Sequence, residues 1–155
     1  MDDPREVAFM RRAIELSAQA LRDKTGRPFG AVIVKDGVII AEGVARQILE
    51  HDCTWHAEIH AIREAGRALG THDLTGCSIY ASSEPCPMCF FAISLANIEQ
   101  VVYGAPWVGD RLWANHKYPF TLEQAALPIL KRKLPARQML AEEAKRVVDQ
   151  ETVHL

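Results

Sequence analysis

Two short apolar runs joined by a turn signal occupy residues 29–44, which read FGAVIVKDGVIIAEGV. The runs at residues 29–35 and 38–44 are rich in β-branched side chains, which favour strands. Asp36-Gly37 between them is a strong signal for a two-residue turn. This stretch therefore predicts a β-hairpin, around which the rest of the chain has to be arranged.

The segments outside this hairpin alternate between helix and strand patterns. Apolar residues at three- and four-residue steps predict helices at residues 5–22, 56–69 and 86–96. Short apolar runs predict two further strands, at residues 77–82 and 100–104. The order helix, strand, strand, helix, strand, helix, strand predicts a mixed sheet covered by helices.

The last third of the chain carries weaker patterns. Residues 105–126 combine aromatic residues with prolines and predict a short helix and an irregular segment. Residues 127–134 are apolar enough for a fifth strand, which Pro128 restricts to a sheet edge. Residues 135–150 predict a closing helix. Together with the elements before them, they predict a single α/β domain over residues 1–155.

The composition is typical of a soluble globular protein. Of the 155 residues, 48% are hydrophobic and 25% are charged, with a formal net charge of −2. A slightly acidic chain is a poor candidate for binding nucleic acid through bulk charge. No apolar stretch reaches the ~20 residues that span a bilayer, and the N-terminus lacks a secretory pattern. We therefore expect a cytoplasmic protein whose four cysteines are metal ligands or buried thiols.

Two motifs supply residues suited to one metal ion. Residues 56–58 read His-Ala-Glu, and residues 85–89 read Pro-Cys-Pro-Met-Cys. His56, Cys86 and Cys89 offer one imidazole and two thiolates, the donors that zinc prefers. Three protein ligands leave a fourth position for water, as catalytic zinc sites do. His-x-Glu followed by Pro-Cys-x-x-Cys is the pattern of zinc-dependent nucleobase deaminases.

The predicted helices explain how these residues can act together. Cys86 and Cys89 begin one helix, where exposed backbone N–H groups and the helix dipole stabilise thiolates. His56 begins another helix, and Glu58 follows it by two residues. Glu58 can stand beside the metal without binding it, take a proton from water and pass that proton to a departing amine. The predicted reaction is hydrolysis of an aromatic amine with release of ammonia.

Other interpretations of these residues meet specific objections. A lone Cys-x-x-Cys could be a redox pair or half of a zinc ribbon, but Cys53 and Cys77 are 24 residues apart and offer no second pair. A zinc-protease helix needs Glu directly after its first His, so His60 is interpreted as a structural or surface residue. The basic run at 131–133 with Arg137 is either a solvated surface or a phosphate-binding patch.

The chain resembles the cytidine deaminase-like superfamily, and within it the guanine or guanosine deaminases and the tRNA adenosine deaminases. The segments that carry the resemblance are residues 28–34, 51–58 and 79–89. The resemblance implies a three-layer α/β/α sandwich with a five-stranded mixed sheet. It also implies one Zn²⁺ per subunit, held by His56, Cys86 and Cys89, and a homodimer with the active site near its interface.

The same resemblance implies roles for individual residues. Glu58 would shuttle protons, and Phe29 would border the base pocket. The backbone N–H of Ala57 and the groups around Glu84 and Cys86 would face the substrate.

Three features depart from the pattern of these families. Ala45 stands where an Asn binds the substrate, and Trp55 places an indole beside a zinc ligand. Residues 113–117 lack the Phe-Asp-Asp-like segment whose acid grips the purine in guanine deaminases. Trp55, Trp107 and Trp113 either form a stacking wall for a flat ring or pack in the core or an interface. Since a pocket built for one hydrogen-bond pattern rejects another, these changes leave the identity of the ring open.

Three functions follow as hypotheses. The first is deamination of a small heterocyclic amine: guanine or a related base or nucleoside, with a cytosine- or isocytosine-like ring or a triazine as further candidates. The second is deamination of adenosine in tRNA, which the small number of clustered basic residues disfavours. The third is a non-catalytic zinc-binding interaction module, which the presence of Glu58 beside an open coordination position disfavours.

Overall fold

The computed structural model describes residues 3–106 and 122–148. Its internal contacts divide the chain into two compact units, residues 1–114 and 115–155. The single domain expected over residues 1–155 stays a prediction.

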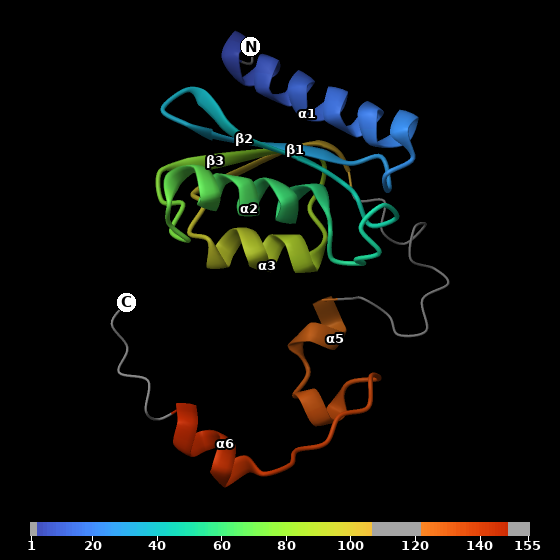
Figure 1. Ribbon diagram of the computed structural model, residues 1–155, viewed down its shortest axis with the longest axis vertical. Helices are drawn as coiled ribbons and strands as arrows, with labels where there is room; N and C mark the ends of the chain where they lie inside the picture. Colours follow the sequence, from blue (N-terminus) through green and yellow to red (C-terminus); the bar gives the residue numbers. More distant parts are fainter. Residues whose placement is uncertain (1–2, 107–121, 149–155) are drawn as a thin grey trace. The chain divides into compact units, whose positions relative to one another are not determined.

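Four strands form a mixed sheet in the first unit, in the order β2-β1-β3-β4 (Figure 1). They are β1 (Gly30–Lys35), β2 (Val38–Val44), β3 (Cys77–Ser83) and β4 (Gln100–Ala105). Strand β1 is antiparallel to β2 and β3, whereas β3 and β4 are parallel. The predicted hairpin is confirmed, and its turn residues Asp36 and Gly37 have φ angles of 51° and 76°. Two-residue hairpin turns of this kind require positive φ at both positions.

Helices cover both faces of this sheet. They are α1 (Pro4–Asp23), α2 (Ala57–Leu69) and α3 (Pro87–Leu95). Helix α1 lies on one face, and α2 and α3 lie together on the other (Figure 1). Side chains along β3 point alternately to the two faces of the sheet and so contribute to two separate core clusters. Tyr80 packs in the cluster with Leu16 of α1, and Ile79 packs in the cluster with Ala61 of α2. The predicted α/β/α layering is confirmed for this unit.

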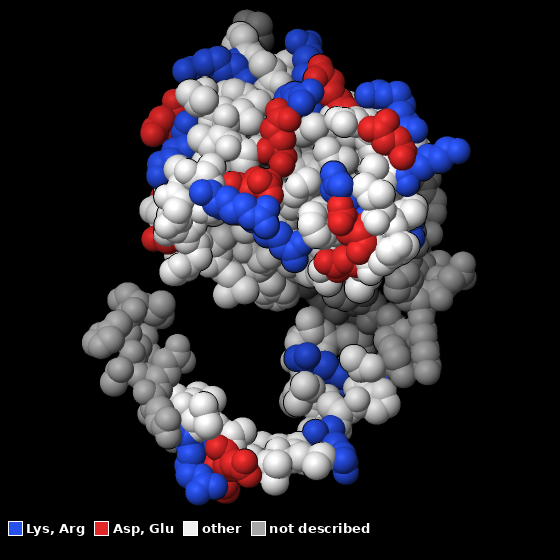
Figure 2. Space-filling view, viewed as in Figure 1, with Lys and Arg blue, Asp and Glu red and all other residues white. Residues whose placement is uncertain are grey.

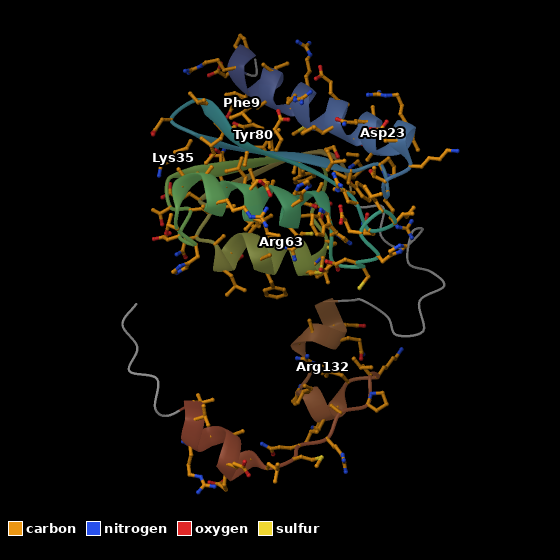
Figure 3. The ribbon with its side chains drawn as sticks, in the orientation of Figure 1. Phe9, Asp23, Lys35, Arg63, Tyr80 and Arg132 are labelled. Atoms are coloured by element: carbon orange, nitrogen blue, oxygen red, sulfur yellow. The ribbon has the colours of Figure 1, made fainter. Side chains whose placement is uncertain are left out.

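Helix α1 is held to the sheet by aromatic and polar contacts. The rings of Phe9 and Tyr80 meet edge to face between α1 and the sheet, with centroids 5.3 Å apart (Figure 3). The Tyr80 hydroxyl lies 3.1 Å from a carboxylate oxygen of Glu6. Burial and this hydrogen bond raise the pKa of Tyr80 to about 12, so the hydroxyl remains a donor. Arg12 donates two hydrogen bonds of 2.7 Å to Glu42 of β2.

Helix α2 lies unusually close to β2. A Cβ atom on Gly43 would collide with the carbonyl oxygen of Ala57 and the amide nitrogen of Ala61. Because Ala57 is the first residue of α2, this contact fixes the start of the helix against β2. His56 directly precedes Ala57, so this packing also fixes the position of the His56 backbone that carries the imidazole.

The fifth strand predicted at residues 127–134 is wrong, and the described residues form a sheet of four strands. Ile129–Lys131 form a 3-10 helix instead, after Pro128. The guanidinium of Arg132 donates to the carbonyl oxygens of Ala125 and Leu127. The segment therefore satisfies its backbone locally, without the neighbouring strand that an edge strand needs.

The second unit contains short helices. They are α5 (Leu122–Ala126), the 3-10 helix Ile129–Lys131 and α6 (Ala141–Val148). The closing helix predicted from residue 135 begins only at Ala141, after Leu140, whose φ of 51° is left-handed. A left-handed residue cannot continue an α-helix, so residues 135–139 remain non-helical.

Candidate functional site

His56, Cys86 and Cys89 converge at the start of α2 and α3. Their three candidate ligand atoms lie within 4.8 Å of one another. His56 Nδ1 is 3.5 Å from Cys86 Sγ and 3.4 Å from Cys89 Sγ. Tetrahedral zinc with bonds of about 2.3 Å to sulfur and about 2.0 Å to nitrogen separates an N–S ligand pair by about 3.5 Å. The spacing therefore fits one zinc ion, and the predicted ligand set forms a candidate zinc site.

The ends of two helices direct these side chains toward the site. His56 occupies the N-cap position of α2, and its Nδ1 contacts the two sulfur atoms instead of capping the helix. Cys86 is the N-cap of α3, and its sulfur accepts a hydrogen bond from the Cys89 backbone N–H at 3.5 Å. Pro87, at the first position of α3, suits a helix start because its missing N–H has no intrahelical partner there.

The two thiols of the site differ in protonation. Hydrogen bonds from Cys89 and His56, opposed by burial, lower the pKa of Cys86 to about 5. The pKa of Cys89 is raised by its interaction with Cys86, by burial and by the negative charge of Glu58. Zinc takes thiolate ligands, so its binding releases any proton that these two sulfur atoms still carry.

Glu58 is the buried carboxyl group of the site. Only 6% of the residue is exposed, and burial raises the pKa of its carboxyl group. A hydrogen bond with the Cys89 thiol acts against burial and lowers the pKa of Glu58. Because general acid–base catalysis works best when the pKa lies near the operating pH, a carboxyl group with a raised pKa is suited to proton transfer.

The residues predicted to bind substrate stay a prediction, and the structure gives the burial and backbone contacts of most of them. Phe29 and Ala45 are neighbours, because the Ala45 N–H donates to the Phe29 carbonyl oxygen at 3.1 Å. Ala45 and Ala57 are fully buried. The Glu84 residue is exposed, and its backbone N–H donates to the carbonyl oxygen at the end of β4. Trp107 and Trp113 lie outside the described residues.

Trp55 packs beside α2. Its ring meets that of His60 edge to face, with centroids 5.5 Å apart, and the guanidinium carbon of Arg63 lies 5.1 Å from its ring centre. His60 Nδ1 lies 3.0 Å from the carbonyl oxygen and 3.1 Å from the amide nitrogen of Val44. His60 is therefore structural, as predicted, since it links α2 to the end of β2.

Ser83 is a buried polar residue close in sequence to the zinc ligands that the sequence analysis did not single out. It is the last residue of β3, three positions before Cys86, and is 7% exposed. The sequence does carry a hint of its burial, because every second residue of a strand faces the same side. Ile79, Ala81 and Ser83 occupy such alternate positions in β3, and all three are buried. A polar residue in that phase, just before a metal ligand, could have been singled out.

Comparison with known families and proteins gives a consistent assignment. Residues 4–105 match the cytidine and deoxycytidylate deaminase zinc-binding region. The chain is 41% identical to the guanine deaminase of Bacillus subtilis over 131 residues, which cover 84% of this chain and 83% of that protein. It is 42% identical to the tRNA-specific adenosine deaminase of Bacillus subtilis over 97 residues, which cover 63% of this chain and 60% of that protein.

Structural comparison agrees with the sequence matches. The crystal structure of a guanine deaminase from Bacillus subtilis has a TM-score of 0.79 at 35% identity, with 100% of each chain covered. The family match spans most of this chain and includes His56, Glu58, Cys86 and Cys89. The chain therefore belongs to the cytidine and deoxycytidylate deaminase zinc-binding family and is a zinc-dependent deaminase.

Proposed function

We propose that this protein hydrolyses the exocyclic amine of guanine, or of a closely related base or nucleoside, and releases ammonia. The observation that carries the proposal is the convergence of His56, Cys86 and Cys89 beside the buried carboxyl group of Glu58. The choice of guanine rests on similarity to a guanine deaminase over most of the chain. Cytosine- or isocytosine-like rings and triazines remain alternative substrates.

In this proposal the residues divide the chemistry among them. His56, Cys86 and Cys89 hold one zinc ion per subunit. When bound, zinc supplies a Lewis acid that makes water acidic enough to react at neutral pH. Glu58 accepts a proton from the attacking water and delivers it to the departing amine. Because the Glu58 carboxyl group is buried, bulk water does not compete with it as a proton acceptor.

We place the heterocycle against residues beside the zinc centre. Phe29 would contact its apolar face, and the Ala57 N–H would donate to its polar edge. Ala45 stands where related enzymes have Asn. Its small side chain would leave space for the ring but would offer no amide group to hydrogen-bond it. Trp55, Glu84 and Trp107 complete the proposed substrate-binding set.

Editing of adenosine in tRNA is the second candidate, because tRNA-specific adenosine deaminases also match. Two observations disfavour it. Arg132, in the main basic run, donates to two backbone carbonyl groups of its own unit. On the face of the first unit seen in Figure 2, basic and acidic side chains are interspersed rather than forming a continuous basic track. A non-catalytic zinc module is disfavoured by the retained, buried Glu58.

A homodimer is proposed from the surface of α3. Apart from Ser94 this helix is apolar, a composition typical of buried helices, yet Phe90 and Phe91 are about half exposed and Leu95 is 82% exposed. Phe90 directly follows the ligand Cys89, so the proposed interface adjoins the zinc centre. A cytoplasmic location is proposed because none of the four cysteines is in a disulfide. Among the described helices, none is long and apolar enough to cross a membrane.

The proposed function is tested by ammonia release from a panel of substrates. Zinc-loaded protein is given guanine, guanosine, adenine, cytosine, isocytosine, an aminotriazine and tRNA. Release that is fastest with guanine or guanosine supports the proposal. Release from tRNA alone promotes the editing alternative, and no release from any substrate by protein that contains zinc refutes deamination.

A further inference from the structure

Ser83 carries a buried hydroxyl group without a partner. Among the described residues, two buried side-chain polar atoms lack a hydrogen bond, Ser83 Oγ and Trp55 Nε1. Both flank the zinc ligands, since Trp55 precedes His56 by one residue and Ser83 precedes Cys86 by three. A buried polar group without a partner is costly and rare, so it calls for a physical explanation.

The strand register places the Ser83 side chain on the zinc side of the sheet. Along β3, Ile79 belongs to the core cluster that contains residues of α2 and α3. Successive side chains on a strand alternate between faces, so Ser83 lies on the same face as Ile79. Ala31 of β1 and Ala81 form the last pair of their antiparallel ladder, so Phe29 and Ser83 each lie two residues beyond that pair, at the same end of the two strands. Phe29 packs against the same cluster.

The adjacent Ser82 shows how a structural serine in this strand behaves. Its side chain points to the opposite face, and its Oγ accepts a hydrogen bond of 3.1 Å from the Gly30 N–H. Ser82 is thus satisfied by the fold, whereas Ser83 is not. Among the described residues, Ser83 is thus a buried serine whose hydroxyl group is left available for a ligand.

We propose that Ser83 is a specificity-determining residue, whose hydroxyl group hydrogen-bonds a polar ring atom of the bound heterocycle. This inference rests on the proposed function. Ser83 lies at the same end of the β1–β3 pair as Phe29, the residue proposed to contact the ring, and at the end of the strand that leads to Cys86. A hydroxyl group donates one hydrogen bond and accepts others, which suits a lactam or amidine edge that presents both kinds of atom.

The matched variants Ser83→Ala and Ser82→Ala separate this role from a structural one. In Ser83→Ala we expect KM for guanine to rise about tenfold with kcat nearly unchanged. The reason is that the variant loses a hydrogen bond that the parent forms equally in the enzyme–substrate complex and in the transition state. We expect no fall in its melting temperature, since none of the described residues forms a hydrogen bond with this hydroxyl group. In Ser82→Ala the melting temperature should fall, with KM within about twofold of the parent, because a bond to the backbone is lost.

Guanine binding to the Glu58→Gln protein, with and without Ser83→Ala, gives a readout independent of turnover. Calorimetry should show binding about tenfold weaker when Ser83 is replaced. If the parent deaminates guanine and Ser83→Ala leaves KM and affinity unchanged, the Ser83 proposal is overturned while the proposed function stands. If the parent releases no ammonia but Ser83→Ala still weakens guanine binding tenfold, the proposed function fails and Ser83 remains a binding residue. Absence of guanine binding overturns both.

Discussion

The Nδ1 atom of His56 lies 3.4 Å from the Sγ atom of Cys89, although 33 residues separate them in sequence. The contact joins the start of α2 to the first turn of α3. A zinc ion at this point would tie together the two helices that cover one face of the sheet. The site therefore depends on the packing of both helices as well as on the ligands themselves.

Removal of a ligand should release the metal. We expect His56→Ala, Cys86→Ser and Cys89→Ser each to lower zinc content from about one ion per chain to a small fraction of that, because a three-ligand site loses a third of its donors. Elemental analysis of purified protein measures this directly. Cys53→Ser is the matched control, since Cys53 is exposed and belongs to no candidate metal group among the residues that the structure describes. Full zinc content in any of the three ligand variants would contradict the assignment.

A single methyl group added at Gly43 should destabilise the close contact between α2 and β2. Gly43→Ala would push the backbone of Ala57 and Ala61 away, and we expect a loss of about 3 kcal/mol in the free energy of unfolding. Urea denaturation measures the loss, and zinc affinity should fall with it because His56 moves with α2. Gly70→Asn is the control, because nothing surrounds Gly70 and its left-handed φ is tolerated by Asn. Equal stability of the two variants would contradict this account.

The link between Arg12 and Glu42 predicts a stability that depends on pH. The hydrogen bonds from Arg12 lower the pKa of Glu42 in the folded state. A carboxyl group with a lowered folded pKa stabilises the protein above its unfolded pKa of about 4.3, and this contribution is lost as the pH falls. Glu42→Gln should therefore lower the melting temperature by about 1–4 °C at pH 7 and by less below pH 4.

Glu15→Gln is the matched control for this pair. Glu15 also contacts Arg12, at 3.1 Å, but its side chain is more exposed. Its replacement should change the melting temperature less than Glu42→Gln does at pH 7. A Glu42→Gln effect that grows as the pH falls would refute the stated role of the pair.

The exposed face of α3 predicts a concentration-dependent dimer. We expect the parent protein to have the mass of a dimer in light scattering, and Leu95→Glu to shift it toward the monomer, because a buried charge opposes apolar association. Leu21→Glu is the control, since Leu21 is an exposed leucine of α1 on the other side of the sheet. A monomeric parent, or a Leu95→Glu protein that stays dimeric, would rule out this interface.

The hairpin and the zinc ligands could be predicted from sequence because local chemistry determines them. Asp36-Gly37 demands a tight turn, and the spacing of Cys86 and Cys89 matches one helical turn. The error at residues 127–134 arose because apolar content alone does not say whether a neighbouring strand exists. There, side-chain bonds from Arg132 close a local turn instead.

Ser83 escaped sequence reasoning for a different reason. Its identity is ordinary for the end of a strand, and only the folded structure shows that its side chain is buried at the end of β3 and has no hydrogen-bond partner among the described residues. The close approach at Gly43 was likewise invisible, because the distance between a strand and a helix far along the chain is a tertiary property. Both features depend on packing between elements rather than on any local pattern.

In the proposed reaction, the buried carboxyl group of Glu58 next to the zinc centre carries the proton during guanine hydrolysis. Ammonia release from guanine by Glu58→Gln tests it most directly, with Glu64→Gln on the same helix as control. We predict that Glu58→Gln keeps its zinc and melting temperature but loses about 10²–10⁴-fold in kcat, whereas Glu64→Gln, whose carboxylate pairs with exposed Arg67, does not. Turnover by zinc-loaded Glu58→Gln equal to that of the parent would contradict the account.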